Sequence, residues 1–204
     1  MSQKHLSRVL SKLEDFNNPK LFLEQYKTNS DVAAEILWSL DMKGFVKNRV
    51  VVDLGAGTGV LGIGALLLGA SKVVFLEKDE SAIDLLKNNL NKVEEEFVLG
   101  DYEIIKGDVS SVLGSFDLVL MNPPFGTKTK RMDTVFLEKA FSLSDNILTI
   151  HKSSTKDYIF NLFRDNDFEV VDLFDFDYVL KKTYDHQSAL SKKIEVSAFF
   201  ARKK

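Results

Sequence analysis

Two periods of hydrophobic and polar positions alternate along most of this chain. From residue 50 onward, short apolar runs typical of buried strands are followed by segments with apolar side chains every three or four residues, which are typical of helices. This alternation predicts a mainly parallel sheet wrapped by helices. The predicted strands are residues 50–54, 73–76, 102–105, 116–121, 146–150, 168–178 and 194–201, and the predicted helices are residues 59–68, 81–91, 133–144 and 155–164.

The two ends of the chain depart from this alternation. Residues 1–46 are predicted to be a helical extension, with Ser30 or Asp31 as the N-cap of a helix that carries Val32 and Ile36 on its apolar face. The last two predicted strands are long and consecutive, which favours an antiparallel hairpin. We therefore expect an α/β fold with a seven-stranded, mostly parallel sheet, helices on both faces and a C-terminal antiparallel hairpin. In such a sheet the site lies beyond the carboxyl ends of the strands.

Composition narrows the class of protein. The chain has 204 residues, 45% of them hydrophobic, with three prolines and no internal repeat, so we expect one domain spanning residues 1–204. No apolar run is long enough for a membrane helix and the N-terminus lacks the pattern of a signal peptide, so we expect a cytoplasmic protein. Cysteine is absent, which excludes disulfides and thiolate nucleophiles, and three scattered histidines lack metal-ligand spacing. We expect no metal.

A glycine-rich turn follows the first predicted strand. Residues 51–59 read VVDLGAGTG, and Gly55, Gly57 and Gly59 permit tight backbone geometry and the close approach of a ligand. Such a turn serves NAD, FAD or S-adenosylmethionine sites, and it also occurs as a purely structural turn. Asp53 favours S-adenosylmethionine, because a carboxylate suits the cationic amino-acid end of that cofactor and repels a pyrophosphate.

Further acidic residues follow the next two predicted strands. Glu77 lies about 20 residues beyond the glycine turn, where a carboxylate can accept hydrogen bonds from ribose hydroxyls. Asp108 follows the third strand and can accept from an adenine amino group, while the backbone N–H of Val109 meets the ring. Each acid alone is also typical of a turn or a helix N-terminus. Their occurrence in series after successive strands favours a cofactor site.

The most specific motif is Asn122-Pro123-Pro124-Phe125, directly after the fourth predicted strand. Two prolines restrict the backbone and remove two N–H donors, which leaves carbonyl oxygens as acceptors. An exocyclic amine is a poor nucleophile because its lone pair is delocalised into the ring. If the Asn122 side chain and the Pro123 carbonyl accept its two N–H groups, the lone pair is directed at a methyl donor. Phe125 is then placed to stack on an unpaired or flipped base.

These residues resemble the class I methyltransferases that act on planar amines, whose motif is Asn/Asp-Pro-Pro-Phe/Tyr/Trp. A closer resemblance spans most of the chain. Residues 19–28, the segment from Asn122 to Lys128 and the HKSST segment at 151–155 are similar to the methyltransferase-like protein 5 family. The resemblance implies a Rossmann-like class I methyltransferase fold and the formation of N6-methyladenosine in small-subunit ribosomal RNA, with S-adenosylmethionine as the methyl donor.

The resemblance also implies several site residues and a partner. It places Gln25, Tyr26 and Thr28 over the cofactor, within an extension of residues 1–46 that covers the cofactor site. We expect RNA contacts from a basic and polar set near the mouth of the site: Lys128, Lys130, Arg131, His151 and Lys152. Eukaryotic family members depend on a small zinc-binding activator, the Trm112 protein, and a Trm112-like partner is expected at the edge formed by the third strand, flanked by Phe97, Val98 and Leu99.

This chain departs from the eukaryotic pattern, which has cysteines in the glycine loop, because Ala56 and Thr58 stand there. The departure indicates a prokaryotic relative, with an archaeal source as one option, and leaves the need for an activator open.

Two alternative functions also stay open. Protein glutamine N5-methyltransferases share the motif around Asn122 but typically carry Tyr at the position of Phe125 and a separate N-terminal domain. A ribosome-assembly module that binds the cofactor without catalysis is the other alternative. A DNA adenine methyltransferase is disfavoured because 204 residues leave no room for a target-recognition domain.

Overall fold

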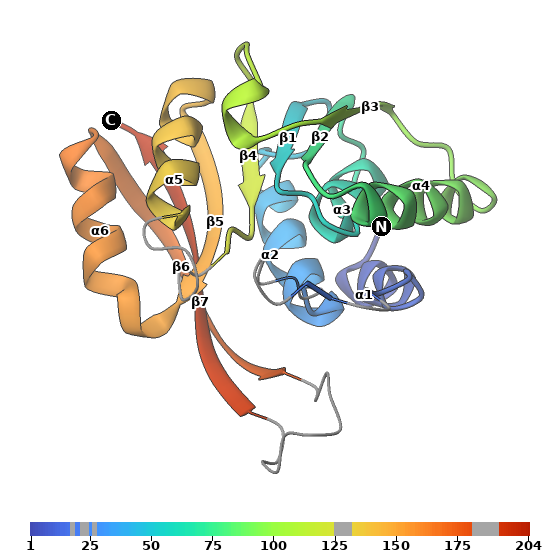
Figure 1. Cartoon of the computed structure of the whole chain (residues 1–204), viewed down its shortest axis with the longest axis horizontal. Coiled ribbons are helices and arrows are strands. Elements are labelled where there is room, and N and C mark those ends of the chain that lie inside the picture. Colours follow the sequence, from blue (N-terminus) through green and yellow to red (C-terminus); the bar gives the residue numbers. More distant parts are fainter. Residues whose placement is uncertain (17–18, 21–24, 26–27, 125–131, 181–191) are drawn as a thin grey trace.

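Seven strands form one sheet in the order β3-β2-β1-β4-β5-β7-β6 (Figure 1). The computed structural model describes residues 1–16, 19–20, 25, 28–124, 132–180 and 192–204. The strands are β1 Val50–Leu54, β2 Lys72–Glu77, β3 Asp101–Lys106, β4 Leu118–Met121, β5 Asn146–Lys152, β6 Phe168–Leu180 and β7 Lys192–Lys203. The helices are α1 Gln3–Ser11, α2 Ser30–Met42, α3 Val60–Leu67, α4 Glu80–Glu94, η2 Val109–Ser111, α5 Met132–Leu143, η3 Ser153–Thr155 and α6 Lys156–Asp165.

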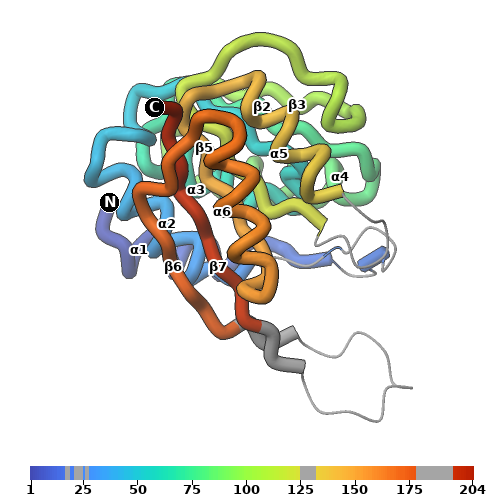
Figure 2. The backbone as a smooth tube through the Cα atoms, turned by 90° about the vertical axis from the view of Figure 1, so that its left-hand side faces the viewer, coloured from blue at the N-terminus to red at the C-terminus, as the bar shows by residue number. Residues whose placement is uncertain are grey.

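The strand directions confirm the predicted sheet. β1 pairs in parallel with both β2 and β4, β2 pairs in parallel with β3, and β4 pairs in parallel with β5. β7 runs antiparallel to β5 and to β6, which makes the predicted C-terminal hairpin. The hairpin is longer than its neighbours, and its far end extends past the body of the domain (Figures 1 and 2). The order reverses between β1 and β4, and a reversal of this kind opens a crevice for ligands.

Helices cover both faces of the sheet, as predicted. One hydrophobic cluster joins α1, α2, α3 and α4 to side chains such as Val51 and Phe75. A second cluster joins α5 and α6 to side chains on the opposite face, such as Val52 and Val74. Neighbouring residues of one strand therefore belong to different cores, because successive side chains of a strand point to opposite faces.

The N-cap of the second helix within residues 1–46 is not the predicted one. The N-cap of α2 is Asn29, whose Oδ1 accepts from the backbone N–H groups of Asp31, at 2.8 Å, and Val32, at 3.2 Å. The expectation of Ser30 or Asp31 as the cap is wrong because Asn is an equally good cap one residue earlier. Asp31 instead accepts a hydrogen bond from the Ser7 hydroxyl and so links α2 to α1. Residues 14–16, between the two helices, are not helical.

A glycine allows α3 to pack closely on the sheet. A Cβ added at Gly62 would lie 2.2 Å from Cε1 of Phe75 in β2, and Phe75 is fully buried. We expect Gly62→Ala to lower the free energy of unfolding by about 1–3 kcal/mol through overpacking. Denaturant unfolding of Gly62→Ala, Phe75→Leu and the double variant measures this. The double variant should be more stable than the sum of the single effects predicts, and strict additivity would contradict the contact.

Candidate functional site

The predicted site residues gather at the carboxyl ends of neighbouring parallel strands. They line a cleft of about 670 Å³ that lies between the glycine turn and the loop after β4. A second hollow of about 330 Å³ adjoins it, and Gly55, Gly57 and Asn122 line both. Of the predicted residues, the larger cleft is lined by Gln25, Gly55, Gly57, Glu77, Asp108, Val109, Asn122 and Pro124, and the second hollow also by Thr28 and Asp53.

The glycine turn has the backbone geometry that its sequence predicts. Gly55, Gly57 and Gly59 have φ values of 71°, 56° and 87°, a region that other residues rarely adopt. The N–H groups of Gly55 and Ala56 each donate to the carbonyl of Leu76 at 2.9 Å, which ties the turn to the end of β2. A Cβ at Gly57 would also lie 3.3 Å from Cζ of Phe16, which is a tight contact. The turn therefore exposes main chain to the cleft.

Glu77 is held by the main chain on three sides. Its Oε2 accepts from Gly57 N–H at 2.8 Å, and its Oε1 accepts from the N–H groups of Lys78, at 2.8 Å, and Asp79, at 2.9 Å. A carboxylate has about four lone-pair positions, so these bonds leave capacity for a ligand hydroxyl. The side chain is thus oriented before any ligand arrives.

Asp53 is fully enclosed behind the glycine turn. Burial raises its pKa to about 7, a hydrogen bond from Gly62 N–H to Oδ2 at 2.8 Å opposes this rise, and the nearby Glu77 carboxylate adds to it. A cation brought close to Asp53 would favour its ionised form and lower the pKa again. The side chain is therefore suited to respond to a positively charged group in the second hollow, which it lines.

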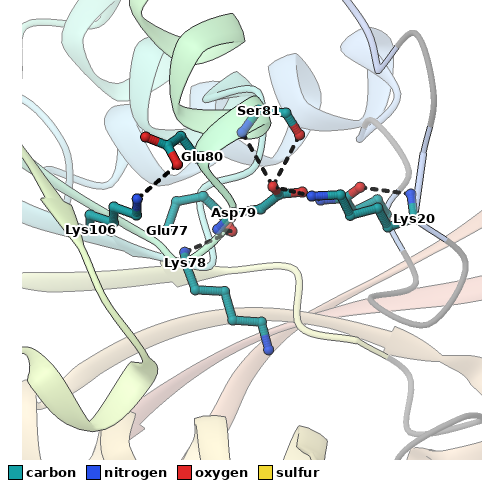
Figure 3. A network of polar contacts seen from close by, with 8 residues as sticks. Lys20, Glu77, Lys78, Asp79, Glu80, Ser81 and Lys106 are labelled. Atoms are coloured by element: carbon teal, nitrogen blue, oxygen red, sulfur yellow. Dashed lines mark hydrogen bonds and ion pairs between the residues drawn. The ribbon is translucent and has the colours of Figure 1, made fainter.

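Asp79 connects the segment before α2 to the cleft, and the sequence did not single it out. Its Oδ1 accepts from Lys20 Nζ, and the same carboxylate caps α4 through Ser81 (Figure 3). Its Oδ2 accepts from Gln25 Nε2. Burial alone would raise the pKa of Asp79, but these hydrogen bonds outweigh it and hold the pKa below its usual range. Gln25 is thereby placed at the cleft that it lines.

The loop after β4 meets the same segment. Asn122 Nδ2 donates to Thr28 Oγ1 at 3.0 Å, a contact between residues 94 positions apart. Pro123 is buried, and Pro124 lines the larger cleft. Further residues that line the larger cleft were not predicted as site residues. These are Phe16, Leu76, Lys78, Gly107 and Phe136. Nothing in their local sequence distinguishes them from ordinary core or surface residues.

The predicted RNA contacts fall into two groups, those that lie outside the described residues and those that belong to β5. Lys128, Lys130 and Arg131 lie outside the described residues, as do Tyr26 and Phe125. Lys152, the last residue of β5, is half-buried.

His151 lies within β5 and is fully buried, so its side chain does not face the surface here, and its expected contact with RNA stays a prediction. Its Nε2 is 2.7 Å from Thr149 Oγ1, while Nδ1 is buried and has no hydrogen-bond partner within the described part of the chain. Burial lowers the pKa of His151 to about 3.

Across the described residues, no three His, Asp or Glu side chains come together in a way that would hold a metal ion. No helix within them is both long and apolar enough to cross a membrane.

The buried imidazole makes stability sensitive to acid. The folded chain keeps His151 neutral down to a pKa of about 3, whereas an unfolded chain takes up the proton near pH 6.5. The unfolded state therefore binds more protons between these values, and His151 lowers the free energy of unfolding as the pH falls, by at most about 1.4 kcal/mol per pH unit. We expect His151→Gln to lose this dependence. In denaturant unfolding from pH 7 to pH 4, a constant stability difference between variant and parent would contradict the assignment.

Comparison with known proteins supports a methyltransferase assignment. The family model of the methyltransferase small domain matches residues 25–150. The rRNA N(6)-adenosine-methyltransferase METTL5 of Danio rerio is 39% identical over 166 residues, which cover 78% of this chain and 78% of the relative. An uncharacterized protein of Methanocaldococcus jannaschii is 34% identical over 98% of this chain and 93% of its own length.

Solved structures agree with this similarity. A Pyrococcus horikoshii protein assigned provisionally to the RNA methyltransferases has 38% identity and a TM-score of 0.90, covering 100% of this chain and 98% of that one. The magnesium protoporphyrin IX methyltransferase of Synechocystis PCC 6803, solved with bound S-adenosylmethionine, is 15% identical with a TM-score of 0.67 over 85% of this chain and 78% of its own, a likeness of fold alone. With its family model matching more than half of the sequence and relatives similar over most of it, the chain belongs to the methyltransferase small domain family, in the group related to METTL5.

Proposed function

We propose that this protein transfers a methyl group from S-adenosylmethionine to the N6 amine of an adenine in ribosomal RNA, in the small subunit. The observation that carries the proposal is the position of Asn122. It lines both the cleft beside Glu77 and the hollow beside Asp53, so an amine held by Asn122 would face a ligand bound along the glycine turn. The rRNA adenosine methyltransferases named among the relatives support the substrate class.

The residues present fit the cofactor. Left-handed glycines leave a main-chain cradle that a Cβ would fill, and Glu77 has capacity for a ribose hydroxyl. Asp108 and Val109 line the same cleft, where the adenine ring would lie, and Asp53 would face the cationic amino-acid end in the second hollow. When bound, S-adenosylmethionine supplies an electrophilic methyl group on a sulfonium.

The extension of residues 1–46 would cover the cofactor. The Phe16 ring lies over Gly57, and Gln25 is fastened to Asp79 at the cleft. Thr28 lines the second hollow and accepts from Asn122. The same segment therefore reaches both the cofactor cleft and the motif that begins at Asn122-Pro123-Pro124, which we call the acceptor motif.

The residues after β4 would activate the acceptor amine by hydrogen bonding. Since the amide nitrogen of Asn122 donates to Thr28, its carbonyl oxygen is oriented as an acceptor for one N–H of the amine. The Pro123 carbonyl accepts the other, and the nitrogen lone pair is then directed away from both. No strong base is needed, because the methylated amine gains acidity and loses its proton to water.

A protein N5-glutamine methyltransferase is not favoured. Three relatives by sequence that match more than three quarters of the chain are rRNA adenosine methyltransferases. A cofactor-binding assembly module without catalysis would not need the Asn122–Thr28 contact that orients an acceptor.

The function is tested by separating binding from transfer. We expect Asn122→Ala to abolish N6-methyladenosine formation while calorimetry shows nearly unchanged S-adenosylmethionine affinity. Glu77→Ala should instead weaken cofactor binding by about 1–3 kcal/mol, because buried hydrogen bonds to ribose are lost. The substrate is rRNA from a strain that lacks the gene, read by nucleoside mass spectrometry. Parental methylation by Asn122→Ala, or methylation of protein in place of RNA, would refute the proposal.

A partner at β3 is the second part of the proposal. β3 is an edge strand of the sheet, and an edge offers unpaired backbone groups to another chain. Val98, just before it, is fully exposed, whereas Phe97 and Leu99 pack partly on the domain's own core. We infer that a Trm112-like zinc-binding activator adds a strand to β3 and covers Val98.

An outward charge tests this edge. We expect Val98→Asp to weaken binding of the Trm112-like protein about 10-fold or more, because a buried unpaired charge is costly. Val171→Asp, at a half-exposed valine of the opposite edge strand β6, is the matched control and should bind as the parent does. Affinity is measured by calorimetry and solubility by gel filtration. Equal binding by both variants would count against pairing at β3.

A further inference from the structure

An unsatisfied imidazole lies at the carboxyl end of β5. Thr149 and His151 are both fully buried, and the pair is joined by the 2.7 Å contact between the Thr149 hydroxyl and Nε2. Ser197, the residue opposite His151 on β7, bonds to Ser153 and donates to Asp175. Its hydroxyl is thus already used in the described structure, and Nδ1 of His151 is left without a partner there. A buried polar atom without a partner costs stability, so its retention calls for an explanation.

The acceptor motif leaves the sheet beside this imidazole. Met121, the last residue of β4, pairs with Thr149 in β5. Pro123 and His151 each lie two residues beyond that pair, so both lie just past the last paired residues of β4 and β5. Pro123 is buried as well. Met121 belongs to the core on the α5 and α6 face, and so does Phe199, whose ring contacts His151. The imidazole is therefore on the same face as the foot of the acceptor motif.

The hydrogen-bonding chemistry of the two groups is complementary. Proline has no N–H, so the main chain of Pro123 and Pro124 offers only carbonyl acceptors. A neutral imidazole carries one N–H donor and one acceptor nitrogen. If the Thr149 hydroxyl donates to Nε2, the proton resides on Nδ1, and the free position is a donor. Burial keeps the ring neutral at working pH, since the pKa of His151 is about 3.

We propose that His151 is a positioning residue for methyl transfer: with RNA and cofactor bound, its Nδ1–H donates to a main-chain carbonyl of Pro123 or Pro124 and sets the direction of the acceptor motif. This inference rests on the proposed function, in which the Pro123 carbonyl receives an amine N–H. A carbonyl oxygen has two lone pairs and can accept from both donors. His151 itself touches neither the base nor the cofactor.

Two amide substitutions distinguish the roles of the two ring nitrogens of His151. The Asn side chain places its amide near the position of Nδ1, whereas the longer Gln side chain reaches the position of Nε2 and the Thr149 hydroxyl. We expect His151→Asn to retain most of kcat. We expect His151→Gln and His151→Phe to lose kcat about 10- to 100-fold, because the acceptor is misdirected. KM for RNA and calorimetric affinity for S-adenosylmethionine should stay within about twofold of the parent, because no binding contact is removed.

A purely structural role gives a different pattern. His151→Gln would then keep kcat, or kcat of all three variants would follow thermal stability, and either result overturns the proposal. Ser144→Ala is the matched control, because Ser144 is a buried hydroxyl next to the opposite end of β5 and accepts from Asn146 N–H. It should lower the melting temperature without a change in kcat.

A second measurement tests the protonation state of His151 and does not depend on methyltransferase activity. Nitrogen-15 NMR of histidine-labelled full-length protein should show His151 protonated on Nδ1 and not titrating between pH 5 and pH 8, and a proton on Nε2 would overturn the proposal. The two levels of inference remain distinguishable. If Asn122→Ala still methylates RNA, the proposed function fails, whereas if Asn122→Ala is inactive and His151→Gln keeps kcat, only the role of His151 fails.

Discussion

The site depends on the three main-chain hydrogen bonds to the carboxylate of Glu77. They join the turn after β1 to the turn after β2, because Gly57 donates from the first and Lys78 and Asp79 donate from the second. The left-handed glycines make that geometry accessible at low strain. The two joined turns form the floor of the cleft, at the point where the strand order of the sheet reverses. The other site residues are arranged around this floor.

The N-terminal segment is attached to this floor at two separate points. Asn89 of α4 is fully buried and bonds to both main-chain groups of Glu14, at 2.6 and 3.2 Å, as well as to the carbonyl of Thr58 in the glycine turn, at 2.9 Å. Asp79 holds Lys20 and Gln25 farther along. Both anchors bracket Phe16, whose ring lies over Gly57. Buried hydrogen bonds of this kind are costly to break unpaired, so they hold Phe16 and Gln25 in place as part of the wall of the cleft.

The acceptor side is built on different elements. The motif after β4 is supported on one side by Thr28, through the Asn122 amide, and on the other by the end of β5, where Thr149 pairs with Met121. The two halves of the proposed reaction, cofactor and base, are thus placed by neighbouring parallel strands β1, β2, β4 and β5. Their carboxyl ends meet at one edge, which brings loops distant in sequence within hydrogen-bonding reach.

Local pattern alone determined the strand and helix order, the bounds of β1, the glycine turn, and the acids Asp53, Glu77 and Asp108 as candidate cofactor ligands, since the periods of strands and helices are short-range properties. The resemblance to a family added Gln25 and Thr28.

The roles of Asp79 and Phe16 could not be predicted, because they depend on contacts across more than 40 residues. The N-cap at Asn29 was missed because Asn29, Ser30 and Asp31 are all good caps and local propensity does not choose among them. His151 looked like a polar residue at a strand end, yet packing of β7 and α6 against β5 buries it. Only tertiary structure decides which polar side chains are enclosed, because burial depends on what other segments pack against them.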